Sequence, residues 1–160
     1  MSDKSFSYVD HQHFMQLALA QAQLALAQGE VPVGAVIVNA QQEVVASGYN
    51  RTITDQDPSA HAEMVALRLA AQRLGNHRLN GLRLYVTLEP CTMCAGAILH
   101  SRIEHLIIAA PDPKTGACGG HYNVLANRAL NPHCRVTMGV LQEPCQQLLQ
   151  DFFRKKRSSL

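Results

Sequence analysis

The sequence predicts a three-layer α/β/α domain around a central mixed sheet of five strands. Strand-like and helix-like segments alternate along the chain, which is typical of a sheet covered by helices. The 160 residues suffice for one domain with a substantial core. We find no repeat, linker or low-complexity tract. We therefore expect a single domain over 1–160, with a flexible N-terminus at 1–9 and a basic tail at 154–160.

Two amphipathic segments predict the first two helices. Asp10 can cap a helix from about 11 to 28, with Phe14, Leu17, Leu24 and several alanines on its inner side. The second helix is expected over 60–74, with Ser59 as its cap, and its first turn would carry His61 and Glu63. Its inner face is formed by four residues at helical spacing: Met64, Leu67, Ala71 and Leu74.

Shorter apolar runs predict the strands and the two remaining helices. A hairpin is expected from 33–39 and 43–47, and further strands at 82–87, 105–110 and 135–138. Helices are expected from about residue 94 and over 143–156. The loop at 111–123 is rich in Gly and Pro and follows the end of a strand, where functional residues are common.

Composition favours a soluble intracellular protein. Hydrophobic residues make up 47% of the chain, but no apolar run approaches the roughly 20 residues that span a bilayer. The opening residues lead into no signal-peptide core. Five cysteines that include a C-x-x-C pair fit a reducing cytosol better than a disulfide scaffold. We expect a cytoplasmic protein without membrane contact. The net charge of +2 does not by itself suggest a nucleic-acid partner.

Three potential zinc ligands lie in two separate segments. His61 opens the triplet His61-Ala62-Glu63, and Pro90 precedes Cys91 and Cys94, two thiols three residues apart. Residues three apart on a helix share a face, so both sulfurs can reach one metal ion. One imidazole and two thiolates leave the fourth tetrahedral position open, as in catalytic zinc sites. We therefore expect one zinc ion per chain.

Glu63 is the expected proton carrier. It lies two residues from His61, and zinc lowers the pKa of a bound water to roughly 7. A structural zinc site and a redox C-x-x-C pair are the alternatives, but neither gives Glu63 a role. The pattern therefore predicts hydrolytic chemistry. Cys118 and His121 have a ligand-like spacing but no further ligand pair, so both are left out of the metal site.

The motifs resemble those of the bacterial tRNA adenosine deaminases, within the zinc-dependent cytidine/deoxycytidylate deaminase superfamily. Their signature, H-x-E…P-C-x-x-C, is present here. Further matching segments are Glu30-Val31-Pro32-Val33-Gly34-Ala35-Val36, Gly48-Tyr49-Asn50-Arg51, Ser101-Arg102-Ile103, Lys114-Thr115-Gly116-Ala117 and Asp151-Phe152-Phe153-Arg154. The resemblance covers nearly the whole chain, poorly in the opening dozen residues and loosely over 119–135.

The resemblance implies a cytidine-deaminase-like fold, a homodimer and a tRNA anticodon stem-loop as partner. The implied reaction converts adenosine to inosine at the wobble position. Zinc-bound hydroxide would attack C6 of the flipped adenine while Glu63 shuttles protons and ammonia leaves. A small-molecule deaminase acting on guanine, cytosine or a nucleoside, with the same zinc chemistry, is the alternative.

Substrate contacts also follow from the resemblance. Asn50 matches a base-contacting asparagine, which we favour over the alternative that it only holds a turn. Val33 aligns with a position that packs on the base, and Ala62 would offer its backbone amide. Asp112 would contact a ribose or hold a turn. Pro111 stands where the family often has a basic residue, which is a departure from the pattern.

The end of the chain combines aromatic and cationic residues. Phe152 and Phe153 precede four consecutive cations that begin with Arg154. Rings stack on unpaired bases and cations meet phosphates, so we expect Phe152, Phe153 and Arg154 to contact RNA. The alternative is that the cations only complement the dipole of a solvated helix end.

Overall fold

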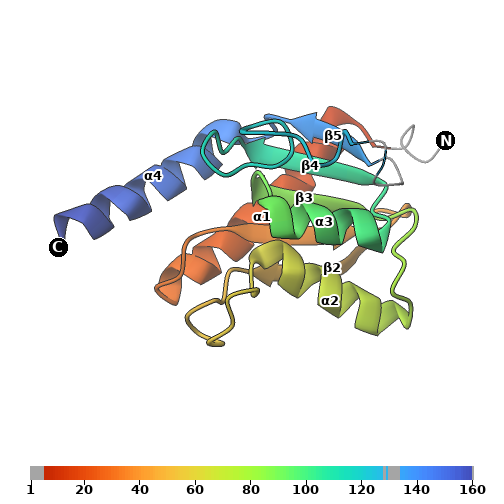
Figure 1. Ribbon diagram of the computed structural model, residues 1–160, viewed down its shortest axis with the longest axis horizontal. Coiled ribbons are helices and arrows are strands. Elements are labelled where there is room, and N and C mark those ends of the chain that lie inside the picture. The colour runs from red at the N-terminus through yellow and green to blue at the C-terminus, as the bar shows by residue number, and fades with distance from the viewer. Residues whose placement is uncertain (1–5, 128, 130–133, 160) are drawn as a thin grey trace.

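The residues that the structure describes form four helices around a five-stranded sheet (Figure 1). This computed structural model describes residues 6–127, 129 and 134–159. The strands are β1 (Gly34–Val38), β2 (Val44–Tyr49), β3 (Arg83–Leu88), β4 (His105–Ala110) and β5 (Arg135–Met138). The helices are α1 (Tyr8–Ala27), α2 (Ala62–Leu74), α3 (Thr92–Ser101) and α4 (Gln142–Ser158). Every predicted strand and helix is present, within a few residues of its predicted bounds.

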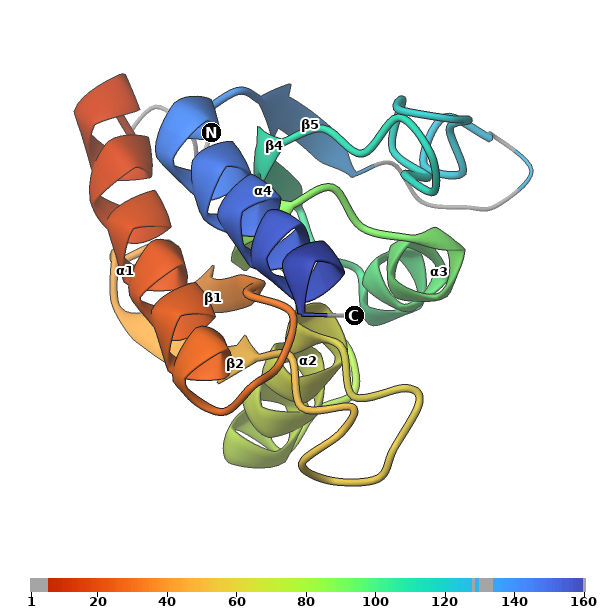
Figure 2. The same ribbon diagram turned by 90° about the vertical axis from the view of Figure 1, so that its left-hand side faces the viewer.

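Helices cover both faces of the sheet, which confirms the predicted three layers. Helices α1 and α4 lie on one face and α2 and α3 on the other (Figure 2). Alternate strand residues face opposite sides, so Leu84 packs in the α2/α3 core while its neighbour Tyr85 packs against α1. None of the described helices has the length and apolar character that a membrane crossing needs.

The sheet is mixed, with strand order β2-β1-β3-β4-β5. Strand β1 is antiparallel to both β2 and β3, whereas β3, β4 and β5 run parallel. The last residues of β3 and β4, Leu88 and Ala110, are paired in register. The segment that follows β3 therefore emerges beside the loop that follows β4.

Helix α1 begins three residues before the predicted start. Ser7 is its N-cap and accepts a bond from the Asp10 amide, while the Asp10 carboxylate accepts from the Ser7 amide. This reciprocal pair makes Asp10 the third helical residue and not the cap. Phe6 is buried, so residues 6–9 do not belong to a flexible N-terminus as predicted. Residues 1–5 lie outside the described part of the chain.

The inner face of α1 consists mainly of small residues. Phe14 is buried as predicted, but Leu17 and Leu24 are exposed, which corrects that part of the prediction. A Cβ at Gly34 of β1 would collide with the backbone of Ala18 and Ala22. Helix and strand are therefore so close that the contact tolerates alanine and glycine but no leucine.

The start of α2 also differs from the prediction. His61 is the N-cap, just outside the first turn in which it was expected, and Ala62 is the first helical residue. Ser59 does not cap the helix: its amide and hydroxyl both donate to the carboxylate of Asp57. At the other end, Gly75 closes α2 in a left-handed conformation.

Candidate zinc centre and substrate pocket

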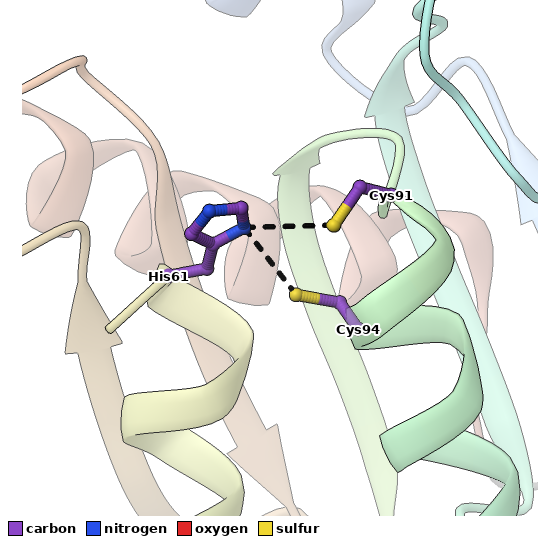
Figure 3. A group of neighbouring side chains, drawn as sticks. All are labelled: His61, Cys91 and Cys94. Atoms are coloured by element: carbon purple, nitrogen blue, oxygen red, sulfur yellow. Dashed lines mark hydrogen bonds between the residues drawn. The ribbon is translucent and has the colours of Figure 1, made fainter. Parts of the chain in front are cut away.

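The three predicted ligands meet where α2 and α3 begin (Figure 3). His61 is the N-cap of α2, Cys91 is the N-cap of α3, and Cys94 is the third residue of α3. Neither His61 nor Cys91 uses its side chain to cap its helix. The imidazole and both sulfurs therefore remain directed at one another across the gap between the two helices.

The distances in this cluster fit a zinc ion. The Nδ1 atom of His61 lies 3.6 Å from the Sγ of Cys91 and 3.6 Å from the Sγ of Cys94. Tetrahedral bonds of about 2.1 Å to nitrogen and about 2.3 Å to sulfur would place these atoms about 3.6 Å apart. Within residues 6–127, 129 and 134–159, this is the only group of three potential ligands close enough to share one ion.

The local electrostatics favour a metal-binding thiolate. Hydrogen bonds from Cys94 and His61 lower the pKa of Cys91 to about 3. The bond to Cys91 in turn raises the pKa of both His61 and Cys94. Without metal, the negative charge therefore sits on Cys91 and the proton stays on Cys94. Binding of a cation would displace that proton, and the positive ends of two helix dipoles support the resulting charge.

Glu63 lies beside the cluster but is not one of its ligands. It is the second residue of α2, and its side chain is buried at 4% exposure. Burial raises the pKa of Glu63 to about 6. A carboxyl group with such a pKa can both accept and donate a proton near neutral pH, which is what general acid–base catalysis requires.

A cavity of about 260 Å³ adjoins the cluster. It is bounded by Glu63, the ligands His61 and Cys91, and four further residues that were predicted to contact substrate: Val33, Asn50, Ala62 and Asp112. The structure thus brings together residues from five separate segments. Other lining residues were not singled out by sequence reasoning: Val31, Thr52, Leu88, Glu89 and Thr115. All five could have been suspected, because each stands within three residues of a predicted site residue.

A second, wider hollow of about 640 Å³ continues from this cavity toward α4. The two share Leu88, Asp112 and Thr115. We call this hollow the α4 groove, and its other wall includes Leu149, Phe153 and Arg157 of the last helix. A ligand larger than one base can therefore extend from the cavity along α4.

The predicted tail residues take different positions. Phe153 lines the α4 groove and is 44% exposed. Phe152 and Arg154 are not among the residues lining the groove. Phe152 is half-buried and lies under the ammonium of Lys156, and Arg154 donates to Asp151 at 2.6 Å. Of the four terminal cations, Arg157 is the one that reaches the groove.

Cys118 is not part of the cluster of His61, Cys91 and Cys94. Its side chain is buried, its amide donates to the Glu89 carboxylate, and its sulfur lies 4.0 Å from the carbonyl of Pro90. His121 does not join it in a ligand group among the described residues. Burial raises the pKa of the Cys118 thiol to about 12, which disfavours the thiolate.

Comparison with known proteins assigns the family. The model of the cytidine and deoxycytidylate deaminase zinc-binding region matches residues 9–110, a range that includes Glu63 and all three candidate ligands. The chain belongs to this family. A tRNA-specific adenosine deaminase of Haemophilus influenzae is 50% identical over 143 residues, which is 89% of this chain and 83% of that protein.

Solved structures of this deaminase fold include enzymes with different substrates. One comes from a study of A-to-I editing by tRNA:A34 deaminases at the wobble position of transfer RNA. It is 42% identical, with a TM-score of 0.81, and the match covers 86% of this chain and 99% of that chain. A guanine deaminase from Nitrosomonas europaea is 27% identical with a TM-score of 0.78, covering 88% and 83%. The fold is therefore common to RNA-directed and free-base deaminases.

Proposed function

We propose that this protein is a hydrolase that deaminates adenosine to inosine at the wobble position of a tRNA anticodon loop. Identity of 50% to a tRNA-specific adenosine deaminase over most of both chains supports this assignment. The observation that carries it against a free-base deaminase is the α4 groove. The groove extends the base cavity toward Phe153 and Arg157, an aromatic ring and a cation that suit neighbouring nucleotides.

Zinc would be held by His61, Cys91 and Cys94, and when bound it supplies Lewis-acid activation of water. Glu63 takes the proton that the attacking water releases. It passes that proton to a ring nitrogen of the adenine. It then takes a second proton from the hydroxyl added to C6 and delivers it to the amino group, which leaves as ammonia while the carbonyl of inosine forms. Its burial keeps the proton inside the cavity during the transfer.

The remaining cavity residues orient the base. The Asn50 amide, only 7% exposed, can donate to a ring nitrogen of the adenine and accept from its exocyclic amino group. Ala62 is the first residue of α2, where a backbone amide has no partner within the helix and can donate to the base. Val33 provides an apolar surface for the ring. Asp112 lines both the cavity and the α4 groove, which supports a contact with the ribose.

The test compares substrates on one zinc-loaded preparation. We expect inosine in an unmodified tRNA or anticodon stem-loop, with far slower ammonia release from guanine, cytosine and free adenosine. A preparation that deaminates guanine or cytosine much faster than any tRNA would overturn the proposal in favour of the small-molecule enzyme.

We further propose a cytoplasmic homodimer, which follows from the family resemblance and from a tRNA substrate. Light scattering during gel filtration should give twice the mass of 17.5 kDa. A monomer at micromolar concentration would contradict the homodimer and leave the deaminase assignment intact.

A further inference from the structure

Glu89 is a buried carboxylate without a role in the chemistry described above. It stands between β3 and Cys91 and is only 3% exposed. It is not one of the three clustered ligands, and its backbone amide donates to Ala110 at the end of β4. An acidic side chain is seldom buried without partners, because burial of an uncompensated charge is costly.

The partners of Glu89 are backbone amides of the loop after β4. Its Oε1 accepts from the amide of Asp112 at 2.9 Å. Its Oε2 accepts from the amides of Cys118 at 3.0 Å and Gly120 at 2.6 Å. The loop over 112–120 thus curls around one carboxylate, and the bond from Ala117 to the carbonyl of Pro90 (2.9 Å) draws it to the segment that carries Cys91.

Two glycines make this close approach possible. A Cβ at Gly116 or at Gly120 would collide with the carboxylate of Glu89 and with the carbonyl of Asp112. Both backbone conformations are open to other residues, since neither glycine has a positive φ. The space taken by Glu89 is therefore the reason why these two positions need glycine.

The loop held in this way forms one wall of the substrate cavity. Asp112 and Thr115 line both the cavity and the α4 groove. The Asp112 carboxylate accepts from the amides of Lys114 and Thr115 and from the Thr115 hydroxyl, which makes the turn a rigid unit. The bonds to Glu89 fix where that unit stands relative to the metal cluster.

A second loop that lines the cavity is also held by a buried carboxylate. Glu30 is fully buried, and its carboxylate accepts from the amide and hydroxyl of Thr54, both at 2.6 Å, and from the amide of Ile53 at 3.3 Å. Thr52, which also lines the cavity, is carried by this second loop. Two loops that border the cavity are thus each attached to one buried carboxylate.

We propose that Glu89 is a positioning residue for the substrate, whose carboxylate holds the 112–120 loop as a wall of the cavity. It acts through the placement of Asp112 and Thr115 and leaves the metal cluster unaffected. The identity of the substrate in this inference rests on the proposed function. The effect of Glu89 on the loop is independent of that function.

The first experiment replaces Glu89 with its amide isostere. Glu89→Gln puts an NH₂ group where an oxygen now accepts, so at least one buried loop amide loses its acceptor. A lost acceptor of this kind costs about 1–3 kcal/mol, or roughly 5- to 150-fold in an equilibrium. We expect unchanged zinc content, a KM for the anticodon stem-loop raised at least about tenfold, and a much smaller change in kcat.

Hydrogen exchange provides a readout that does not depend on activity. In Glu89→Gln, the amides of Cys118 and Gly120 should exchange at least about tenfold faster, while amides of β3 and β4 keep their protection. Asp10→Asn, which alters an amide-accepting carboxylate at the start of α1, should change neither KM nor loop exchange.

Gly120→Ala disturbs the same contact from the side of the loop, because its Cβ would meet the Glu89 carboxylate. It provides an independent test if the Glu89 variant misfolds. It should raise KM in the same way, and the double variant Glu89→Gln/Gly120→Ala should be less impaired than the product of the two single effects. Gly96→Ala on α3, where a Cβ would meet nothing within 4 Å, serves as the matched glycine control.

Three outcomes would overturn the proposal: unchanged KM and loop exchange in Glu89→Gln, loss of zinc, or strictly multiplicative effects in the double variant. If the wild-type protein prefers guanine to RNA, the proposed function fails, but faster exchange at Cys118 and Gly120 would still support the role of Glu89 in holding the loop.

Discussion

The backbone amide of Asn50 donates to the carbonyl of Val33 at 3.1 Å. Asn50 follows β2 and Val33 precedes β1, so this bond extends the β1/β2 hairpin by one step beyond the strands. It places the amide side chain and the apolar side chain on the same wall of the cavity. Because the bond uses only main-chain atoms, either side chain can be altered without breaking it.

Asn50→Ala therefore tests the side chain alone. We expect kcat/KM for the anticodon stem-loop to fall by roughly 5- to 150-fold, the range for a substrate group left without its hydrogen-bond partner. Zinc content and the melting temperature should stay near wild type. Steady-state kinetics with metal analysis measures both, and activity at the wild-type level would restrict Asn50 to holding the turn.

Removal of a ligand should abolish metal binding and turnover together. Purified wild-type protein should contain about one zinc per chain, and His61→Ala and Cys91→Ala should each lose it, because two remaining ligands hold zinc weakly. Elemental analysis after dialysis measures the metal. Cys118→Ala is the matched control and should retain its zinc. Retention of full metal by both ligand variants would exclude the assigned site.

Glu63→Gln should separate chemistry from metal binding. The amide has the same shape but cannot carry the proton, so turnover should fall by at least the roughly 10²- to 10⁴-fold that lost general acid–base catalysis costs. Zinc content should be unchanged, because Glu63 is not part of the ligand cluster. Single-turnover assays on metal-replete protein measure the effect. Near-normal turnover would rule out the proton-carrier role.

Two arginines one helical turn apart should differ in their contribution to RNA binding. Arg157→Gln removes a cation from the α4 groove and should weaken binding and flatten its salt dependence. Arg154→Gln removes a cation that pairs with Asp151 outside the groove lining, and should have little effect. Filter binding of the anticodon stem-loop across a salt series compares the two. Equal effects would contradict a specific role for the groove.

Acid should destabilise the protein through His105. This side chain is 6% exposed, and burial, together with the nearby His11 and Arg83, lowers its pKa to about 4 although Glu104 opposes the shift. A histidine that stays neutral in the fold takes up a proton on unfolding. Its contribution to stability is therefore complete above the unfolded pKa of about 6.5 and is lost progressively as pH falls toward 4, by up to about 3 kcal/mol.

Thermal or urea unfolding between pH 7.5 and 4 measures this effect. His105→Gln can retain a bond to the hydroxyl of Thr137, which lies 2.7 Å from Nε2 in the wild type, and should show a shallower loss of stability over this range. An unchanged slope in the variant would assign the acid sensitivity to other groups.

Much of the fold could be predicted because buried strands form continuous apolar runs. Strand β4 begins and ends at the predicted residues, since His105–Ala110 lies between polar segments. Periodicity was less informative for α1. Leu17 and Leu24 are apolar yet exposed, because the face of α1 that meets Gly34 presents Ala18 and Ala22 at that close contact. The strand order of the sheet has no signature in local pattern and required the structure.

The metal cluster and Glu63 could be predicted because each residue type has a distinctive chemistry at a fixed spacing. The structure adds that His61 is the N-cap of α2 and that its Nδ1 faces the sulfurs, neither of which follows from its spacing. Glu30 and Glu89 were not predicted as functional residues. Their partners are mainly backbone amides, and an amide is present at almost every residue, so the sequence carries no pattern for such contacts.

The α4 groove joins two parts of the chain that are far apart in the sequence. One wall comes from residues 111–115 next to the zinc cluster, and the other from the last helix, which projects past the edge of the sheet (Figure 1). Changes in α4 can therefore alter which nucleotides are accepted around the target without touching the residues that act on the base. A deaminase that receives α4 from a related enzyme should adopt the donor's preference for the nucleotides around the target. It should still catalyse its own reaction.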